Sequence, residues 1–176
     1  MKPRYEYVEQ LAYSLLERYK ELDVVATPVV DLCDDLRFAY QEEFLEDAFS
    51  GAAIVDGSKK IVMVNASQSE TRKRFSAAHE IGHLLLHGNQ ALSIDSNSPQ
   101  VMFRDENSSK GIDWREKEAN FFAACLLMPK KRVLTAIQEI GTGSVSEEQI
   151  QIMADRFEVS TQAMCIRLTQ LGFINY

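Results

Sequence analysis

The chain carries its three histidines on one short segment, which reads RFSAAHEIGHLLLHGN over residues 74–89. His79, His83 and His87 follow one another at intervals of four residues, the spacing that places side chains on one face of an α-helix. Any fold for this chain must therefore accommodate a row of imidazoles along a single helix.

Signals at both ends of the segment define that helix. Ser67 and Glu70 have the S-x-x-E spacing of a capping box, and Gly88 stands where a C′ glycine would end a helix. We therefore expect one helix from about residue 68 to residue 87.

The rest of the chain predicts more helices and a small sheet. A D-G pair between two apolar runs indicates a hairpin, and Pro129 ends a helix because the residue before a proline avoids the helical region. We expect strands near 52–55, 61–64 and 101–103. We expect helices over 4–20 and 130–139, a short helix that begins at Pro28, and a helix whose N-cap is Asp113. Two more helices are expected on either side of a turn near 158–160.

These elements predict an α+β fold. It is mostly helical, with a small antiparallel or mixed sheet packed against the histidine helix, and the tail adds a helix-turn-helix-like extension. The expected division is a main domain over 1–140 and a helical extension over 141–176 packed on it.

Composition limits the partners and the compartment. A net charge of -7 leaves no general positive field to attract nucleic acid or an anionic membrane. The N-terminal segment is charged throughout and no apolar run is long enough to cross a membrane, so we expect a cytoplasmic protein. Three separated cysteines, Cys33, Cys125 and Cys165, are expected to be reduced and buried.

The HEIGH stretch has the pattern H-E-x-x-H, which indicates metal-assisted hydrolysis. On a helix, His79 and His83 are close enough to hold one zinc ion, while Glu80 lies beside the ion without binding it. Zinc lowers the pKa of a bound water to about 7, so the Glu80 carboxylate can take a proton from that water.

A catalytic zinc site takes a third protein ligand, and His87 is poorly placed for it. On a continuous helix His87 lies about 12 Å along the axis from His79, too far for both to reach one ion. His87 is instead a candidate for a catalytic or substrate-contacting role at the cleft, or for a local hydrogen bond at the helix end. His87, Arg104 and tyrosines are candidate donors to the oxyanion, and the sequence does not choose among them.

The downstream helix offers two glutamates as the third ligand. Glu116 shares a face with Asn120, which can orient a ligand by a hydrogen bond, and an apolar stripe lies beside that face. The alternatives are that Glu116 is the capping partner of Asp113 and that Glu118 is a solvated charge. The two glutamates point some 200° apart, so one is expected at the metal and Glu118 toward solvent or the cleft rim.

Together three stretches resemble the ImmA/IrrE family of zinc metallopeptidases: SGAAIVDGSKKIVMVN, then RKRFSAAHEIGHLLLH, then EKEANFFAACLLMP. The resemblance implies a gluzincin-like core in which His79, His83 and a glutamate hold zinc. It favours Glu116 over Glu118, because the similar thermolysin-type pattern places its glutamate four residues before a polar residue, here Asn120.

The family resemblance also implies a partner. Its members are associated with proteolysis of helix-turn-helix repressors in bacteria, phages and mobile elements, so we expect a zinc endopeptidase with such a protein as substrate. An alternative is a regulatory binding protein that keeps the fold without proteolysis, but a pure zinc scaffold needs no general base such as Glu80. An extended peptide is expected to add as a strand at the sheet edge near 51–55.

The tail permits one further interpretation. Its helix, turn and helix are typical of a DNA-binding module, yet residues 145–176 carry four acidic side chains against two arginines. Phosphate-binding surfaces are basic, so we expect these helices to pack on the core or dock a protein, and direct nucleic-acid binding is not expected.

Overall fold

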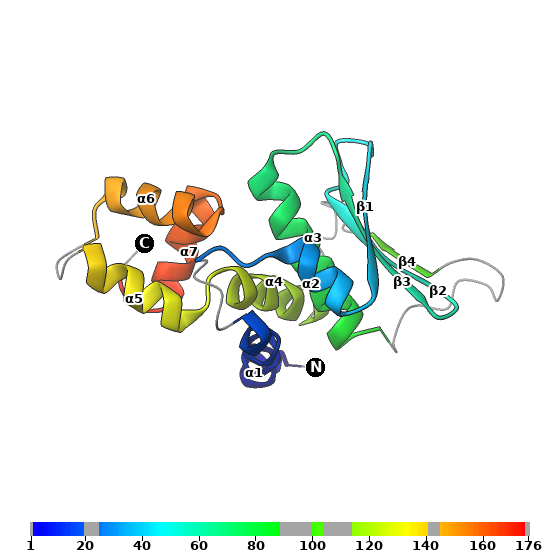
Figure 1. Ribbon diagram of the computed structural model, residues 1–176, viewed down its shortest axis with the longest axis horizontal. Helices are drawn as coiled ribbons and strands as arrows, with labels where there is room; N and C mark the ends of the chain where they lie inside the picture. Colours follow the sequence, from blue (N-terminus) through cyan, green and yellow to red (C-terminus); the bar gives the residue numbers. More distant parts are fainter. Residues whose placement is uncertain (1, 20–24, 89–99, 104–113, 141–144, 175–176) are drawn as a thin grey trace.

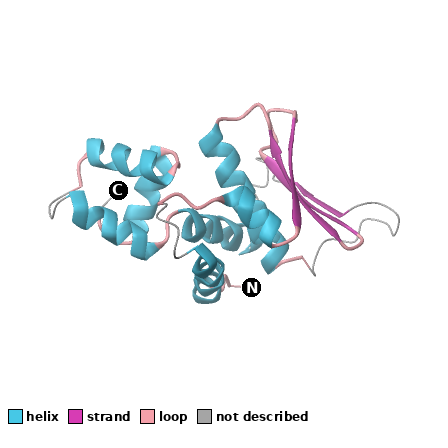
Figure 2. Cartoon of the chain, in the orientation of Figure 1, coloured by secondary structure: helices cyan, strands magenta, loops and turns pink. Residues whose placement is uncertain are grey.

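The computed structural model describes residues 2–19, 25–88, 100–103, 114–140 and 145–174. A small sheet lies at one side, a group of three C-terminal helices at the other, and α3 and α4 between them (Figure 1; Figure 2). The elements are α1 (Tyr5–Leu16), η1 (Glu17–Tyr19), α2 (Val29–Asp35), β1 (Phe38–Glu43), β2 (Gly51–Asp56), β3 (Lys59–Asn65), α3 (Glu70–Leu86), β4 (Gln100–Phe103), α4 (Trp114–Leu127), α5 (Lys130–Ile140), α6 (Glu147–Phe157) and α7 (Thr161–Gln170). The predicted α+β class is confirmed.

The described strands form one mixed sheet in the order β1-β3-β2-β4. The predicted hairpin is confirmed as β2 and β3, which pair antiparallel around a turn where Gly57 has a φ of +57°. β4 pairs antiparallel with the other side of β2 over Ala52–Val55. The expectation of a free edge near 51–55 is therefore wrong, because β4 occupies that edge.

β1 pairs parallel with β3 and has no counterpart among the predicted strands. Only Phe38 in it is buried, and the rest of the strand is intermediate or exposed. The strand lacks the apolar alternation by which a half-buried strand is recognised.

α3 begins two residues later than predicted. Its N-cap is Ser69, whose side chain accepts a hydrogen bond from the backbone of Arg72. The predicted cap Ser67 instead donates its hydroxyl to Asn65. Buried Asn65 also bonds the backbone at Leu45, Glu46 and Phe49, so it ties the loop before β2 to the end of β3.

α3 ends where predicted, but the glycine after it acts differently. His87 is the C-cap residue, and Gly88 does not have the positive φ of a C′ glycine. A Cβ atom at Gly88 would lie 2.5 Å from the carbonyl oxygen of Leu84, so a close approach of backbone requires the glycine there.

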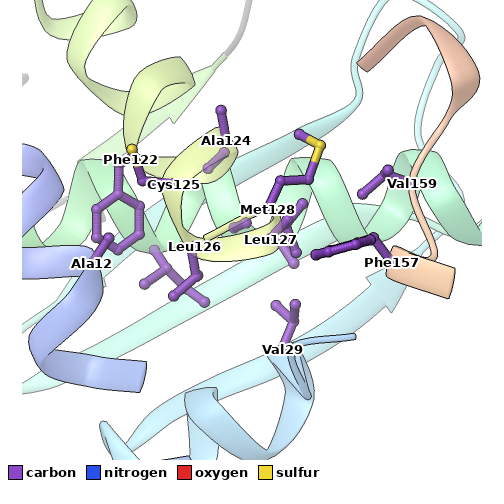
Figure 3. Packing of buried hydrophobic residues seen from close by; sticks show 14 of the residues in the cluster. Ala12, Val29, Phe122, Ala124, Cys125, Leu126, Leu127, Met128, Phe157 and Val159 are labelled. Carbon is purple, nitrogen blue, oxygen red and sulfur yellow. The ribbon is translucent and has the colours of Figure 1, made fainter. Parts of the chain in front are cut away.

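α4 lies inside the molecule, with α3 on one side and α1 on another (Figure 1). All residues from Phe122 to Met128 are buried. This part of the helix is therefore surrounded by protein on every side, whereas an amphipathic helix is buried along one face only. Figure 3 shows Ala12 of α1 beside Phe122, and Phe157 near the C-terminal end of α4. Cys33 and Cys125 are buried and Cys165 is partly so, and all three are free thiols.

The C-terminal helices contribute side chains to the same buried cluster. Met153, Phe157, Met164 and Leu168 belong to the same cluster of buried residues as the core of α3 and α4. Arg167 of α7 donates from Nε to the carbonyl oxygen of Met128 at 3.0 Å. Among the described helices, none combines the length and the apolar character needed to cross a membrane.

Candidate active site

The histidine helix α3 lies antiparallel to α4. His79 faces Asn120, and one turn farther along α3, His83 faces Glu116. Gly82 allows this close approach, because a Cβ atom there would lie 3.0 Å from the Phe122 ring and 3.3 Å from the Cα of Ala119. A small residue at this crossing therefore brings polar groups of the two helices within reach of one another.

Three ligand atoms converge between the helices. The Nε2 atoms of His79 and His83 are 3.0 Å apart, and Glu116 places Oε2 3.3 Å from the first and Oε1 3.0 Å from the second. The two histidine side chains are buried and the Glu116 side chain is 33% exposed. Among the described residues, these three form a group that could hold a metal ion.

The spacing of these atoms fits zinc. Ligand atoms 2.0–2.2 Å from a tetrahedral ion lie about 3.3 Å from one another, close to the separations found here. Two imidazoles and one carboxylate are also a ligand set known for catalytic zinc. The geometry is already formed by the packing of α3 against α4.

Neighbouring groups prepare the ligands for a cation. His79 donates from Nδ1 to Oδ1 of Asn120 at 3.0 Å, which leaves its Nε2 lone pair toward His83 and Glu116. Burial by itself raises the pKa of Glu116, but the adjacent imidazoles of His79 and His83 hold that pKa well below its ordinary value. The site therefore keeps Glu116 ionised, and Asn120 contacts His79, one of the three candidate ligands.

Glu80 follows His79 on α3 and is 1% exposed. A Cβ atom at Gly51 would lie 3.5 Å from both Cγ and Oε1 of Glu80, so the start of β2 passes directly beside this side chain. Ser50, just before the strand, accepts a hydrogen bond from Arg72 of α3 at 2.9 Å. The sheet thus forms one wall next to the carboxylate.

His87 lies behind the site and not in an open cleft. It is 2% exposed, and its ring lies 5.6 Å from the His83 ring and 5.3 Å from that of Trp114. Burial first, and the nearby His83 second, lower its pKa to about 4, so the ring is neutral at pH 7. Trp114 at the start of α4 lies against the His87 ring, which is therefore buried next to His83. A catalytic or substrate-contacting role for His87 stays a prediction.

The structure does not place Glu118 where the sequence predicts it. The sequence predicts this side chain toward solvent or the cleft rim, yet it is fully buried, so that prediction is wrong. Arg4 donates to it from the backbone at 2.6 Å and from Nε and Nη2 at 3.0 and 2.8 Å. Although burial raises the pKa of Glu118, these bonds hold it below the ordinary value. The residues before α1 cover this face of α4, so a charge there needs a partner.

The sequence reasoning did not find Arg4, Ser50 or Gly51 near the site, since nothing in the local pattern links them to α3 or α4. Two candidates lie outside the described residues: Arg104, a suggested oxyanion donor, and Asp113, the suggested N-cap of α4.

Two relatives match part of the chain. The radiation response metalloprotease IrrE of Deinococcus radiodurans is 30% identical over 116 residues, which are 65% of this chain and 32% of that protein. An uncharacterised immunity region protein of Bacillus phage phi105 is 32% identical over 74 residues, 42% of this chain and 41% of that protein. The chain therefore spans less than half the length of these relatives.

A solved structure shares the fold. A Mycobacterium tuberculosis transcriptional regulator aligns with a TM-score of 0.61 and 15% identity, over 93% of this chain and 46% of its own. The model of the IrrE N-terminal-like domain, a peptidase family, matches residues 36–169, which include α3, α4 and the three convergent side chains. The chain belongs to the IrrE N-terminal-like domain family.

Proposed function

We propose that the chain is a zinc-dependent endopeptidase. The observation that carries the proposal is the convergence of His79, His83 and Glu116 at distances that suit a tetrahedral ion, with Glu80 next to them. His79, His83 and Glu116 would hold the metal, and Glu80 would act as the general base.

A bound zinc ion supplies a Lewis acid that polarises a carbonyl group and makes a water molecule acidic near neutral pH. With the metal in place, the Glu80 carboxylate would accept a proton from the attacking water and would later donate it to the leaving amine. Asn120 fixes the ring orientation of His79 through the Nδ1 hydrogen bond, so that Nε2 faces the metal.

His87 has a supporting place in this proposal. Its ring is buried against the rings of His83 and Trp114 and stays neutral at pH 7. Burial favours a role in positioning His83 over direct contact with the substrate. The oxyanion donor among the described residues is not assigned.

We propose a protein substrate, specifically a helix-turn-helix repressor in a bacterial, phage or mobile-element switch. The similarity to a metalloprotease and to a phage immunity-region protein supports a regulatory role. Such a repressor would be met in the cytoplasm. In this proposal residues 1–140 carry the catalysis and residues 141–176 form a helical extension that packs on them, without direct nucleic-acid binding.

The alternative is a non-proteolytic regulatory protein of the same fold that binds a repressor or an antitoxin-like partner. A binding protein with a structural metal needs His79, His83 and Glu116 but has no use for a buried carboxylate at Glu80. Glu80 is 1% exposed and lies beside Gly51, at van der Waals distance from the position that a Cβ atom would take there. The arrangement therefore favours the enzyme.

The test is to mix the purified zinc-loaded chain with the helix-turn-helix repressor encoded nearest to it, with and without a chelator. The proposal expects chelator-sensitive cleavage of the repressor, seen as two fragments by mass spectrometry. Stable binding of an intact repressor by the zinc-loaded chain would instead establish the alternative.

A further inference from the structure

A large groove extends from the site along the same two helices. Its volume is about 1090 Å³, and its walls come from α3, α4 and α7. On α3, Arg72 and Phe75 precede His79 by seven and four residues, so they continue its face. Asn120, which bonds His79, also lines the groove. Asn120 therefore belongs both to the groove wall and to the surroundings of the candidate metal site.

The groove exposes apolar side chains. Ile166 of α7 is 52% exposed and Tyr5 is 46% exposed, and Phe75 and Phe121 are partly buried in the walls. Isolated exposed apolar residues are ordinary, but several around one hollow mark a binding site.

The charged groups of the groove are all positive. Arg72, Lys117 and Arg167 line it, and the described lining includes no aspartate or glutamate. None of these three cations has a carboxylate partner among the described ion pairs. Two helices also begin at the groove, because Ser69 and Ser160, the N-caps of α3 and α7, belong to its lining. Helix N-termini add positive potential.

Arg167 gives a second and independent indication. It is 1% exposed, and its Nη2 atom is buried without a hydrogen-bond partner among the described residues. Its Nε atom bonds a backbone carbonyl, and Nη1 lies 3.5 Å from the amide oxygen of Gln170, so no anion balances the charge. A buried, unbalanced cation in the wall of a groove favours an anionic ligand there.

We propose that this groove docks an apolar, acidic segment of the protein substrate on one side of the scissile bond. The inference rests on the proposed endopeptidase function and names the chemistry of its substrate. The apolar side chains of the segment would contact Phe75, Phe121 and Ile166. Its carboxylates would face the exposed cations Arg72 and Lys117. In a chain with a net charge of -7, such a groove selects acidic segments against the field of the whole molecule.

The test measures binding, so that it does not depend on hydrolysis. Two fluorescent peptides share one apolar pattern, and the remaining positions are glutamate in the first and lysine in the second. Their affinities for the full chain, carrying Glu80→Gln, are measured by anisotropy at low and at moderate salt. The acidic peptide is expected to bind about tenfold or more tightly than the basic one, and less so as salt rises.

Matched variants locate the binding. Lys117→Glu should weaken the acidic peptide about tenfold and strengthen the basic one, while Lys131→Glu, the same change on an exposed residue of α5 outside the groove, should change neither. Ile166→Ser should weaken both peptides, whereas Ile152→Ser, on α6 and 45% exposed, should not. Zinc content of each variant shows that the metal site is intact.

Equal affinity for the two peptides, or equal effects of Lys117→Glu and Lys131→Glu, would overturn the docking proposal. Its failure is distinct from failure of the proposed function. If the chain cleaves its repressor but binds the two peptides equally, only the docking proposal is contradicted. If the chain discriminates the peptides but cleaves no protein, the peptidase proposal is contradicted, and the groove remains a binding site for acidic segments.

Discussion

Two glutamates separated by one residue on α4 have different surroundings. Glu116 meets the histidines of α3, and Glu118 meets Arg4 on the other side of the helix. Their directions follow from the helical turn of about 100° per residue. Both sides of α4 are covered, which the sequence does not predict. Glu118, on the side away from the histidines, is therefore buried and not solvated.

We predict that Glu116→Ala lowers zinc affinity by more than about 100-fold, because it removes a direct ligand and not a supporting contact. Glu118→Ala is its matched control and should keep zinc near one ion per chain, although it should lower the melting temperature. Zinc is measured by elemental analysis of the two purified variants. Normal zinc in Glu116→Ala with none in Glu118→Ala would refute the assignment.

We predict that Arg4→Met destabilises the fold by about 2 kcal/mol, since it leaves the buried Glu118 carboxylate with fewer donors. The Arg4 side chain is 45% exposed, so solvent screening keeps the loss below that of a fully buried pair. Urea unfolding at pH 7 measures it, with Arg18→Met, an exposed arginine of η1, as control. Equal stability of the two variants would show that the ion pair contributes little.

The pH dependence of this pair has a definite sign. Hydrogen bonds from Arg4 hold the pKa of Glu118 below its ordinary value. The stabilisation is therefore present above the unfolded pKa of about 4.3 and is lost as the pH falls through the lowered folded pKa. The stability difference between wild type and Arg4→Met should accordingly shrink on acidification below about pH 4.

At the scale of elements, the crossing of α3 and α4 forms the site, and Gly82 sets how closely the helices approach. The space at this glycine is filled by Phe122 and Ala119, so a larger side chain must push the helices apart. Because His79 and His83 belong to α3 and Glu116 to α4, separating the helices also separates the three candidate metal ligands.

We predict that Gly82→Val lowers the free energy of unfolding by about 3 kcal/mol through overpacking, and weakens zinc binding as well. Gln138→Val, at an exposed position of α5, introduces the same β-branched residue and should cost less than about 1 kcal/mol. Unfolding curves and zinc titrations of both variants check this. Unchanged zinc affinity in Gly82→Val would mean that the site does not depend on this spacing.

Elements and site residues differed in how far they could be predicted. The histidine helix, the hairpin and the C-terminal helix pair are visible in the sequence because periodicity, caps and turn residues are local signals. β1 was missed because its pairing with β3 gives it few buried side chains. The covered edge of β2 was also missed, because strand order is decided by tertiary contacts.

The same limit applies to single residues. His79, Glu80 and His83 form a contiguous motif, and Asn120 marks the face of Glu116, so these positions followed from spacing. The Arg4–Glu118 pair joins residues 114 positions apart. Ser69 and not Ser67 caps α3, because the Ser67 hydroxyl donates its hydrogen bond to Asn65. Such pairings depend on which segments meet, and no local pattern contains that information.

At the scale of the whole molecule, the C-terminal helix pair packs beside α3 and α4. Gln162, Ile166 and Gln170 of α7 line the groove that α7 shares with α3 and α4. The exposed face of the second helix thus forms part of the groove wall, and the pair carries more acidic than basic side chains. Both features favour packing and protein docking over a role in reading DNA.

We therefore predict that the full chain shows no sequence-specific binding to duplex DNA at physiological salt, because its acidic surface cannot neutralise phosphates. A mobility-shift selection from random duplexes checks this. Recovery of one enriched sequence bound at sub-micromolar concentration would contradict it.

The central claim is that Glu80 works as a base beside a metal held by His79, His83 and Glu116. The most direct measurement compares repressor cleavage by wild type and Glu80→Gln, with zinc content determined on the same samples. The account predicts that the variant keeps about one zinc ion per chain and loses cleavage by several orders of magnitude. Cleavage at the wild-type rate by zinc-loaded Glu80→Gln would contradict the account.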